Sequence, residues 1–86
     1  MKKIIEDRGE GFESLLGKRV LIMTAGYFYE GKLVGVNDCC VKLSDAGIVY
    51  ETGKFSDSGY KDIQKLHVDN WYVQMGLIES FGKSKQ

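Results

Sequence analysis

The sequence predicts an all-β fold: a small SH3-like barrel of five strongly bent antiparallel strands, preceded by one short helix. Beyond residue 18, apolar residues alternate or form short β-rich runs instead of following a helical period. The chain has 11 glycines and no proline, so glycine must form its sharp turns and bends. Its 86 residues are too few to cover the apolar edges of an open sheet, which favours a closed or nearly closed barrel.

Length and composition indicate a single domain. Hydrophobic residues make up 43% of the chain and charged residues 28%, values typical of a globular protein. No apolar run approaches the roughly 20 residues that a membrane span needs. The expected organisation is a flexible arm at residues 1–10, a helix at 11–17, a barrel at 18–81 and a polar tail at 82–86.

The expected helix has a narrow apolar stripe. Phe12, Leu15 and Leu16 follow helical spacing, and Gly17 suits a helix end. A helix this short is unstable by itself, so the stripe must dock on the sheet.

The first two strands are expected at residues 19–24 and 27–37, with a turn at Gly26 between them. Gly31 and Gly35 lie inside the second strand. Glycine in a strand interior is typical of a bulge, a tight bend or the close approach of another backbone. The second strand should therefore bend strongly.

The next two strands are expected to form a long hairpin. Its arms lie at residues 40–55 and 60–74, around a turn at residues 56–59. The register that pairs residue 55 with 60 also pairs 41 with 74.

Several residues indicate that this hairpin is irregular. Residues 44–47 suit a bulge or bend, and Asp69 and Asn70 favour an interruption of the return strand. Gly76 then marks a tight corner before a last strand at residues 77–81.

Charge and cysteine content limit the classes of function. Lysine plus arginine and aspartate plus glutamate number 12 each, so the formal net charge is zero, which excludes a strongly basic binder of duplex DNA. Cys39 and Cys40 are adjacent, and a disulfide between strand neighbours would be badly strained. Reduced thiols and a cytoplasmic location are expected.

No motif for catalysis, metal binding or phosphate cradling is present in the sequence. His67 is the only histidine, and Asp69 is expected on the same strand face. A metal site or a general base would need further ligands or a nucleophile beside this pair. The sequence therefore predicts a protein that is not an enzyme and has no cofactor.

The order of motifs resembles the Sm/LSm family of Sm-like and Hfq-type proteins. Residues 16–26 (Leu-Gly-Lys-Arg-Val-Leu-Ile-Met-Thr-Ala-Gly) and the residues that follow them resemble the first family motif, and residues 72–81 resemble the second. The matching positions of the first motif after this stretch are Tyr29, Gly31, Leu33 and Asp38.

One position departs from the first motif. Asn37 stands where the family has its acidic residue, and Asp38 comes one residue late. A one-residue bulge near Gly35 would account for the slip and keep Val41 and Leu43 facing inward.

The resemblance implies a homo-oligomeric ring of about five to seven subunits, in which the fourth strand of one subunit pairs with the fifth strand of the next. A surplus of apolar residues on the last two strands gives an independent reason to expect assembly, because a barrel interior accepts only alternate residues. The residues expected at the subunit interface are Trp71, Tyr72, Leu77, Ile78 and Phe81.

The resemblance also implies binding of single-stranded RNA. Cys40, Lys42 and Met75 occupy the positions where family members carry a stacking side chain, an asparagine and an arginine. None of the three offers planar stacking or an amide, so contacts to the RNA backbone and an altered base preference are expected. The candidate RNA-binding residues are Asn37, Asp38, Cys40, Lys42, Met75, Gly76, Tyr27 and Lys32.

Two alternatives remain open at this stage. Tyr27 either stacks on a base beside Lys32 or packs across strands and against a neighbouring subunit. The ring itself either binds RNA or serves as a structural or protein-interaction scaffold without nucleic acid, a role that the zero net charge favours.

Overall fold

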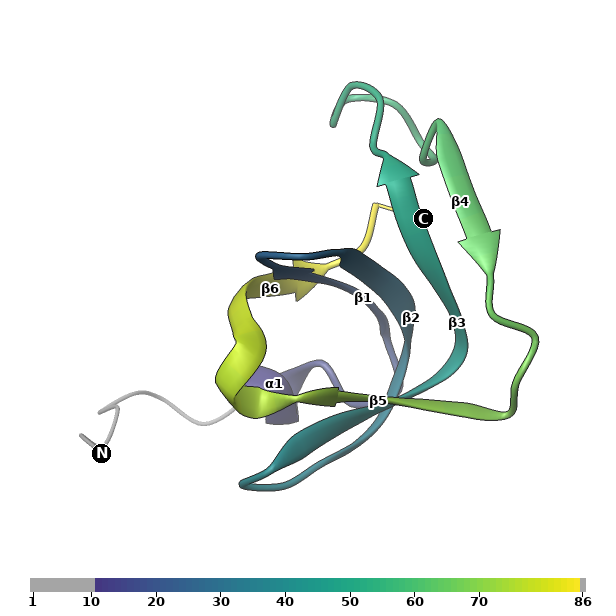
Figure 1. The fold of residues 1–86 in the computed structure, drawn as a ribbon. Helices are drawn as coiled ribbons and strands as arrows, with labels where there is room; N and C mark the ends of the chain where they lie inside the picture. Colours follow the sequence, from purple (N-terminus) through teal and green to yellow (C-terminus); the bar gives the residue numbers. More distant parts are fainter. Residues whose placement is uncertain (1–10, 86) are drawn as a thin grey trace.

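The computed structural model describes residues 11–85 (Figure 1). The expected arm at residues 1–10 and the final Gln86 lie outside the described residues. The elements in chain order are α1 (Gly11–Ser14), β1 (Arg19–Thr24), β2 (Phe28–Val36), β3 (Cys40–Glu51), β4 (Asp62–Lys65), β5 (Asn70–Gln74), the 3₁₀ turn η1 (Met75–Leu77) and β6 (Ile78–Lys83).

The strands form one antiparallel sheet in the order β4-β3-β2-β1-β6, and β5 also pairs with β3. One part of the long β3 pairs with β5 and the rest with β4, so β4 and β5 together make up the expected fourth strand (Figure 1). Residues 66–69 interrupt that strand, as Asp69 and Asn70 indicated, and His67 lies there with φ 54°. The all-β prediction is confirmed.

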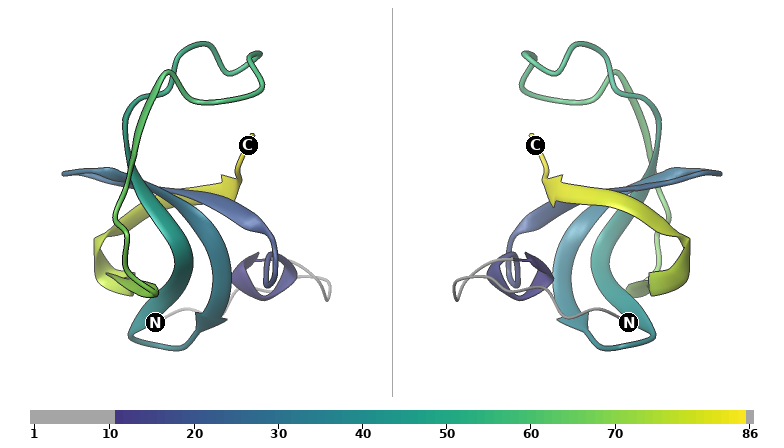
Figure 2. Two further views of the ribbon diagram at one scale, coloured as in Figure 1. Left: turned by 90° about the vertical axis from the view of Figure 1, so that its right-hand side faces the viewer. Right: turned by 90° about the vertical axis from the view of Figure 1, so that its left-hand side faces the viewer.

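The sheet bends strongly but does not close. Within residues 11–85, β6 pairs with β1, and no pairing joins β6 to β4 or β5. Two strand edges are therefore left unpaired, one along β6 and one along β4 and β5. The views in Figure 2 show β2 and β3 curving around the core.

Alternate strand residues build the core, as the period-2 pattern predicted. The buried hydrophobic cluster consists of Val20, Ile22, Leu33, Val41, Leu43, Ala46 and Val73. Phe12 of α1 and Leu15 just after it pack against this cluster, and the Phe12 ring stacks on Phe81 with centroids 3.5 Å apart. The α-helical part stops at Ser14, earlier than expected, and Gly17 follows the turn with φ 84°.

Two bulges shape β2 and β3. The β2–β3 register shifts between Leu33 and Gly35, so the bulge that was expected near Gly35 is present and Val41 and Leu43 face the core. A second shift places Asp45 and Ala46 opposite Gly31 alone, which confirms the irregularity expected at residues 44–47.

The connection between β3 and β4 differs from the prediction. β3 ends at Glu51 and β4 begins at Asp62, so a loop of residues 52–61 replaces the expected four-residue turn. Val41 pairs with Val73 instead of residue 74. The expected register was wrong because a long loop, unlike a tight turn, does not fix the pairing of its two arms.

Gly82 and Lys83 of the expected polar tail are part of the sheet. β6 extends to Lys83, and the backbone N–H of the buried Ser84 donates to the Arg19 carbonyl at 2.9 Å. The Lys85 ammonium donates to the Thr52 carbonyl at 2.8 Å and to the Lys54 carbonyl. Composition alone did not predict these contacts, because residues 82–86 are mostly polar.

Among residues 11–85, no helix has the length and apolar content to cross a membrane.

Gly31 tests the bend of β2. A Cβ at this position would lie 3.1 Å from the Ala46 Cα and 3.1 Å from the Ser44 carbonyl oxygen, both of them backbone atoms. We expect Gly31→Ala to lower the free energy of unfolding by about 1–3 kcal/mol, and Gly31→Val to lower it further. Urea denaturation measures both effects. Gly26→Ala, whose Cβ would meet no atom within 4 Å, should change stability little. Equal stability of Gly31→Ala and Gly26→Ala would contradict the close approach.

Candidate nucleic-acid interface

Asn37 builds the tip of the β2–β3 hairpin. Its Oδ1 accepts the backbone N–H of Cys39 at 2.7 Å and of Cys40 at 3.0 Å, while its own N–H donates to the Cys40 carbonyl at 3.0 Å. An asparagine side chain commonly stabilises a turn in this way. Asn37, which stands where the first Sm/LSm motif has an acidic residue, therefore stabilises the turn through these hydrogen bonds. Asp38, the next residue, lies exposed at the tip.

The tip is joined to the turn between β5 and β6. The Met75 N–H donates to the Cys39 carbonyl at 2.8 Å, and Cys40 pairs with Gln74. The structure thus brings five candidate RNA-binding residues to one end of the sheet: Asn37, Asp38, Cys40, Met75 and Gly76.

Lys42 lies near this end, two residues along β3 from Cys40, and Lys32 lies farther from it, in the middle of β2. Lys42 pairs with Tyr72, and its ammonium lies 6.0 Å from the centre of the Tyr72 ring. Lys32 is exposed and pairs with Ser44, the next residue of β3 on the same face as Lys42. Two cations thus lie on one face of β2 and β3.

Tyr27 is not part of this group. It precedes β2, whereas Asn37 follows the same nine-residue strand, so the two residues lie at opposite ends of it. The Tyr27 ring contacts Tyr29 and Tyr50, with centroids 6.3 Å and 6.5 Å apart. Tyr27 thus makes the cross-strand contacts of the second alternative, and its side chain remains about half exposed.

The expected interface residues divide into two kinds. Trp71 and Ile78 pack partly buried against the core, and Phe81 stacks on Phe12 within the chain. Tyr72 and Leu77 are exposed, by 57% and 61%. Contacts of these residues with another subunit remain a prediction.

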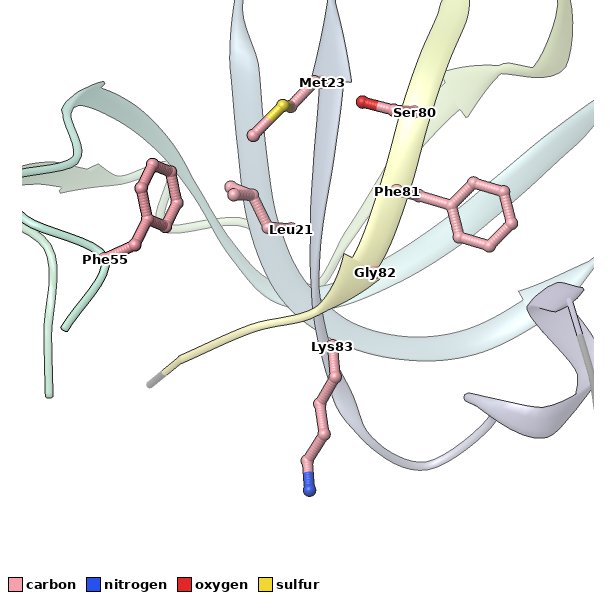
Figure 3. Close-up of a pocket in the computed structure, with 7 residues that line it drawn as sticks. All are labelled: Leu21, Met23, Phe55, Ser80, Phe81, Gly82 and Lys83. Carbon is pink, nitrogen blue, oxygen red and sulfur yellow. The ribbon is translucent and has the colours of Figure 1, made fainter.

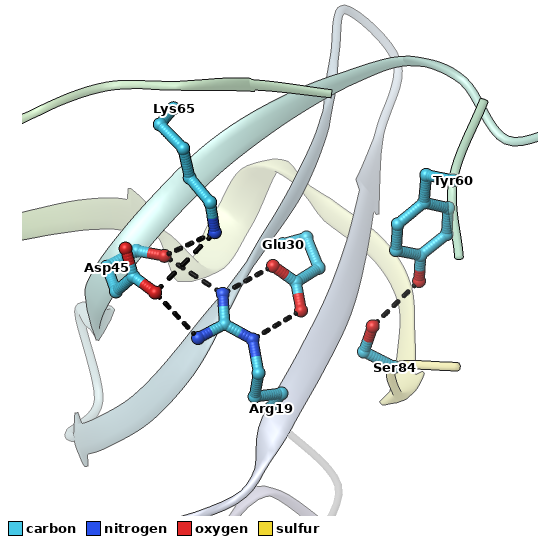
Figure 4. Close-up of polar contacts among 6 residues, drawn as sticks. All are labelled: Arg19, Glu30, Asp45, Tyr60, Lys65 and Ser84. Carbon is cyan, nitrogen blue, oxygen red and sulfur yellow. Dashed lines mark hydrogen bonds and ion pairs between the residues drawn. The ribbon is translucent and has the colours of Figure 1, made fainter. Parts of the chain in front are cut away.

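A buried ion pair crosses β1 and β2, and the sequence analysis missed it (Figure 4). The Arg19 guanidinium donates to both carboxylate oxygens of Glu30, at 2.7 Å and 2.6 Å, and Glu30 is 0% exposed. Arg19 also donates to the Asp45 carboxylate at 3.0 Å, and Lys65 lies 3.5 Å from the same carboxylate oxygen. The network therefore ties β1, β2, β3 and β4 together.

The network shifts two pKa values. The hydrogen bond to Glu30 is the main cause that raises the pKa of Arg19. The charge of Lys65, and next that of Arg19, lowers the pKa of the exposed Asp45. The Arg19–Glu30 ion pair could have been predicted from the sequence. A hairpin turn at Ala25 and Gly26 pairs Arg19 with Lys32 and so places Glu30 diagonally across the two strands from Arg19, within reach of a long side chain.

An apolar groove of about 250 Å³ lies elsewhere, between the β3–β4 loop and strands β1 and β6 (Figure 3). Leu21 and Met23 point toward Phe55 across it, whereas Phe81 points away toward α1. Ser80 and Lys83 contribute its only ionisable or hydroxyl side chains, and no carboxylate or imidazole lines it to activate Ser80.

The next feature is the placement of the side chains that could bind a metal ion. Residues 11–85 contain no group of three or more histidine, cysteine, aspartate or glutamate side chains placed to hold a metal ion. Cys39 and Cys40 are free cysteines, the first exposed and the second half-buried.

Comparison with known structures identifies the fold. A heptameric archaeal Sm protein superimposes with a TM-score of 0.65 over 85% of this chain and 94% of its own, at 15% sequence identity. The chain has an Sm-like fold. The Sm protein of Pyrococcus abyssii in complex with a uridine heptamer gives a TM-score of 0.60 over 85% and 92% of the two chains, at 17% identity. No protein-family model and no curated protein sequence matches the chain.

The Arg19–Glu30 pair yields a stability prediction. Arg19→Met leaves a fully buried carboxylate without its partner, and we expect a loss of about 3–5 kcal/mol in the free energy of unfolding, measured by urea denaturation. The double variant Arg19→Met/Glu30→Leu removes both charges and should regain most of that loss.

The exposed pair Lys61–Glu51, 3.6 Å apart, provides the matched control. Lys61→Met should change stability by less than about 0.5 kcal/mol. An Arg19→Met protein as stable as Lys61→Met would show that the Glu30 carboxylate does not depend on Arg19.

Proposed function

We propose that the chain assembles into a homo-oligomeric ring of about five to seven subunits and binds single-stranded RNA mainly through the RNA backbone. The observation that carries the proposal is an Sm-like fold with two unpaired strand edges and with five of the candidate RNA-binding residues gathered at one end. The two parts, assembly and RNA binding, rest on different residues.

Assembly is supported by the two open edges. The edge of β6 and the edge of β4 and β5 are at opposite ends of the strand order, so one subunit can offer each edge to a different neighbour. Pairing of this head-to-tail kind must close into a ring or continue as a filament. The similar archaeal Sm protein is a heptamer.

RNA binding is supported by the contact between the β2–β3 tip and η1. The hydrogen bond from Met75 to Cys39 holds two separate segments together at the place where the family resemblance expects RNA. Lys42 can contact a phosphate near this place, and Lys32 can contact one farther along the same face. The similar Pyrococcus Sm protein forms a complex with a uridine heptamer.

The base preference is proposed to differ from that of a uridine-specific site. Cys40 and Met75 present sulfur-containing side chains without a planar group or an amide, at two positions where the family recognises a base. Phosphate contacts from lysine do not distinguish one base from another. We also propose that the protein is not an enzyme and that it is located in the cytoplasm.

The second candidate function is a scaffold ring without nucleic acid. The observation in its favour is the balance of 12 basic and 12 acidic residues, which gives no general attraction for a polyanion. Fluorescence anisotropy with labelled oligouridine, oligoadenosine and mixed RNA over a range of salt concentrations decides between the two. Absence of binding to every RNA at low salt would favour the scaffold.

The first prediction of the proposal concerns assembly. Size-exclusion chromatography with light scattering should give a particle of about five to seven subunits of 9.7 kDa. A folded 9.7 kDa monomer at micromolar concentration would overturn the ring.

Leu77 and Phe55 form a matched pair for the interface, because each is 61% exposed. Leu77→Glu should shift the particle toward smaller species, since burial of a leucine contributes about 1.5–3 kcal/mol per interface. Phe55→Glu, in the β3–β4 loop, should leave the particle size unchanged. An intact ring in Leu77→Glu would exclude Leu77 from the interface.

A further prediction of the proposal concerns the phosphate contact of Lys42. If its ammonium contacts a phosphate, Lys42→Ala should weaken RNA binding at low salt and reduce the slope of log affinity against log salt by about 0.7 per lost contact. Lys61→Ala removes the same charge from the loop beyond β3 and should leave the slope unchanged. Strong preference for uridine at high salt would contradict binding through the RNA backbone.

A further inference from the structure

The outer face of the β3–β5 ladder has the chemistry of a platform for single-stranded RNA. Val41, Leu43 and Val73 are buried in the core, so their neighbours along β3 and β5 face the opposite way. We call this surface the outer ladder face; its three residue pairs are Cys40–Gln74, Lys42–Tyr72 and Ser44–Asn70.

Tyr72 lies at the centre of the outer ladder face. Its side chain is 57% exposed, although the Lys42 ammonium lies over the ring at 6.0 Å. An exposed tyrosine ring beside a lysine is the combination on which single-stranded nucleic acids bind, because the ring stacks on a base and the ammonium contacts a phosphate.

The neighbours of Tyr72 suit the same ligand. Gln74 and Asn70 flank it on β5 and are exposed, and their side-chain amides can donate to and accept from base edges. The six residues of the face carry one positive charge and no carboxylate, and Lys32 adds a second cation opposite Ser44. A polyanion is therefore the ligand that this face complements.

The location of the face also points to RNA. Its first pair, Cys40–Gln74, adjoins the β2–β3 tip and η1, where the Met75 N–H bonds to Cys39. A strand of RNA in contact with the tip can thus continue along the ladder. Cys40, Lys42 and Met75 lack a planar group and an amide, but β5 supplies both: the ring of Tyr72 and the side-chain amides of Gln74 and Asn70.

We propose that Tyr72 is the base-stacking residue of this protein, with Lys42 beside it on a phosphate and with Gln74 and Asn70 at the base edges. This inference rests on the proposed RNA binding and assigns Tyr72 to the RNA instead of to a subunit interface. It also predicts that bases contribute to affinity, in addition to the backbone.

The test compares Tyr72→Leu, Tyr72→Phe and wild type by fluorescence anisotropy with labelled oligouridine. Loss of the ring should raise the Kd at least about fivefold, the effect of one lost base stack, whereas Tyr72→Phe keeps the ring and should bind like wild type. The salt slope should stay unchanged in Tyr72→Leu, because no phosphate contact is lost.

Two controls separate stacking from other effects. Tyr50→Leu removes a tyrosine of nearly equal exposure, 54%, from the other end of β3 and should bind like wild type. An abasic oligonucleotide offers phosphates without bases, so wild type and Tyr72→Leu should bind it equally.

Each outcome decides a separate point. If wild type binds no RNA at low salt, the proposed function fails and the inference with it. If wild type binds RNA and Tyr72→Leu binds equally well, Tyr72 is not the stacking residue, while the proposed function stands. Loss of affinity in Tyr50→Leu alone would indicate that bases stack on Tyr50 or on Tyr27, whose ring contacts it. A smaller particle for Tyr72→Leu in light scattering would show that Tyr72 contributes to the subunit interface, as the sequence analysis expected. Either of these results overturns the inference.

Discussion

The strong bend of β2 and β3 is the constraint on which the rest of the structure depends. It needs a close approach of backbones at Gly31, where a Cβ would lie 3.1 Å from two backbone atoms, and one extra residue in β3, where Asp45 and Ala46 both lie opposite that glycine. Because of the bend, β3 pairs with β5 along its first part and with β4 along its second. The bend does not close the sheet, so β6 and β4 remain at opposite ends of the strand order with their outer edges unpaired.

The Arg19–Glu30–Asp45 network lies at the bulge of this bend and stabilises it. Glu30 is fully buried directly before Gly31, and Asp45 lies in the bulge of β3 with φ 49°. A buried carboxylate is costly unless it is fully hydrogen-bonded, and Arg19 supplies both of its hydrogen bonds from β1. The guanidinium also bonds to the Asp45 carbonyl and carboxylate. One side chain thus joins three strands, β1, β2 and β3.

Much of the fold could be predicted from local patterns, and the errors share one cause. Residues 19–24 read correctly as β1 because a β-rich run ends at a turn, and the two bulges followed from Gly35 and residues 44–47. The register of β3 with β5 and the order in residues 82–85 were missed. Both depend on contacts between segments far apart in the chain, such as Lys85 with the carbonyls of residues 52 and 54. Periodicity within one segment carries no information about such contacts.

The same error explains why the proposed role of Tyr72 could not be derived from the sequence. The expected register paired residue 41 with 74, which places residue 72 opposite Leu43, a buried core residue. The structure pairs 42 with 72, and a slip of one residue moves every side chain of a strand to the other face. Under the correct register, Lys42 and Tyr72 share one face of the sheet, where the Lys42 ammonium lies over the Tyr72 ring, and the two side chains together have the chemistry of the proposed stacking site. Functional groups missing at three motif positions can therefore be present in the fold, because a sheet places side chains of separate strands in one site.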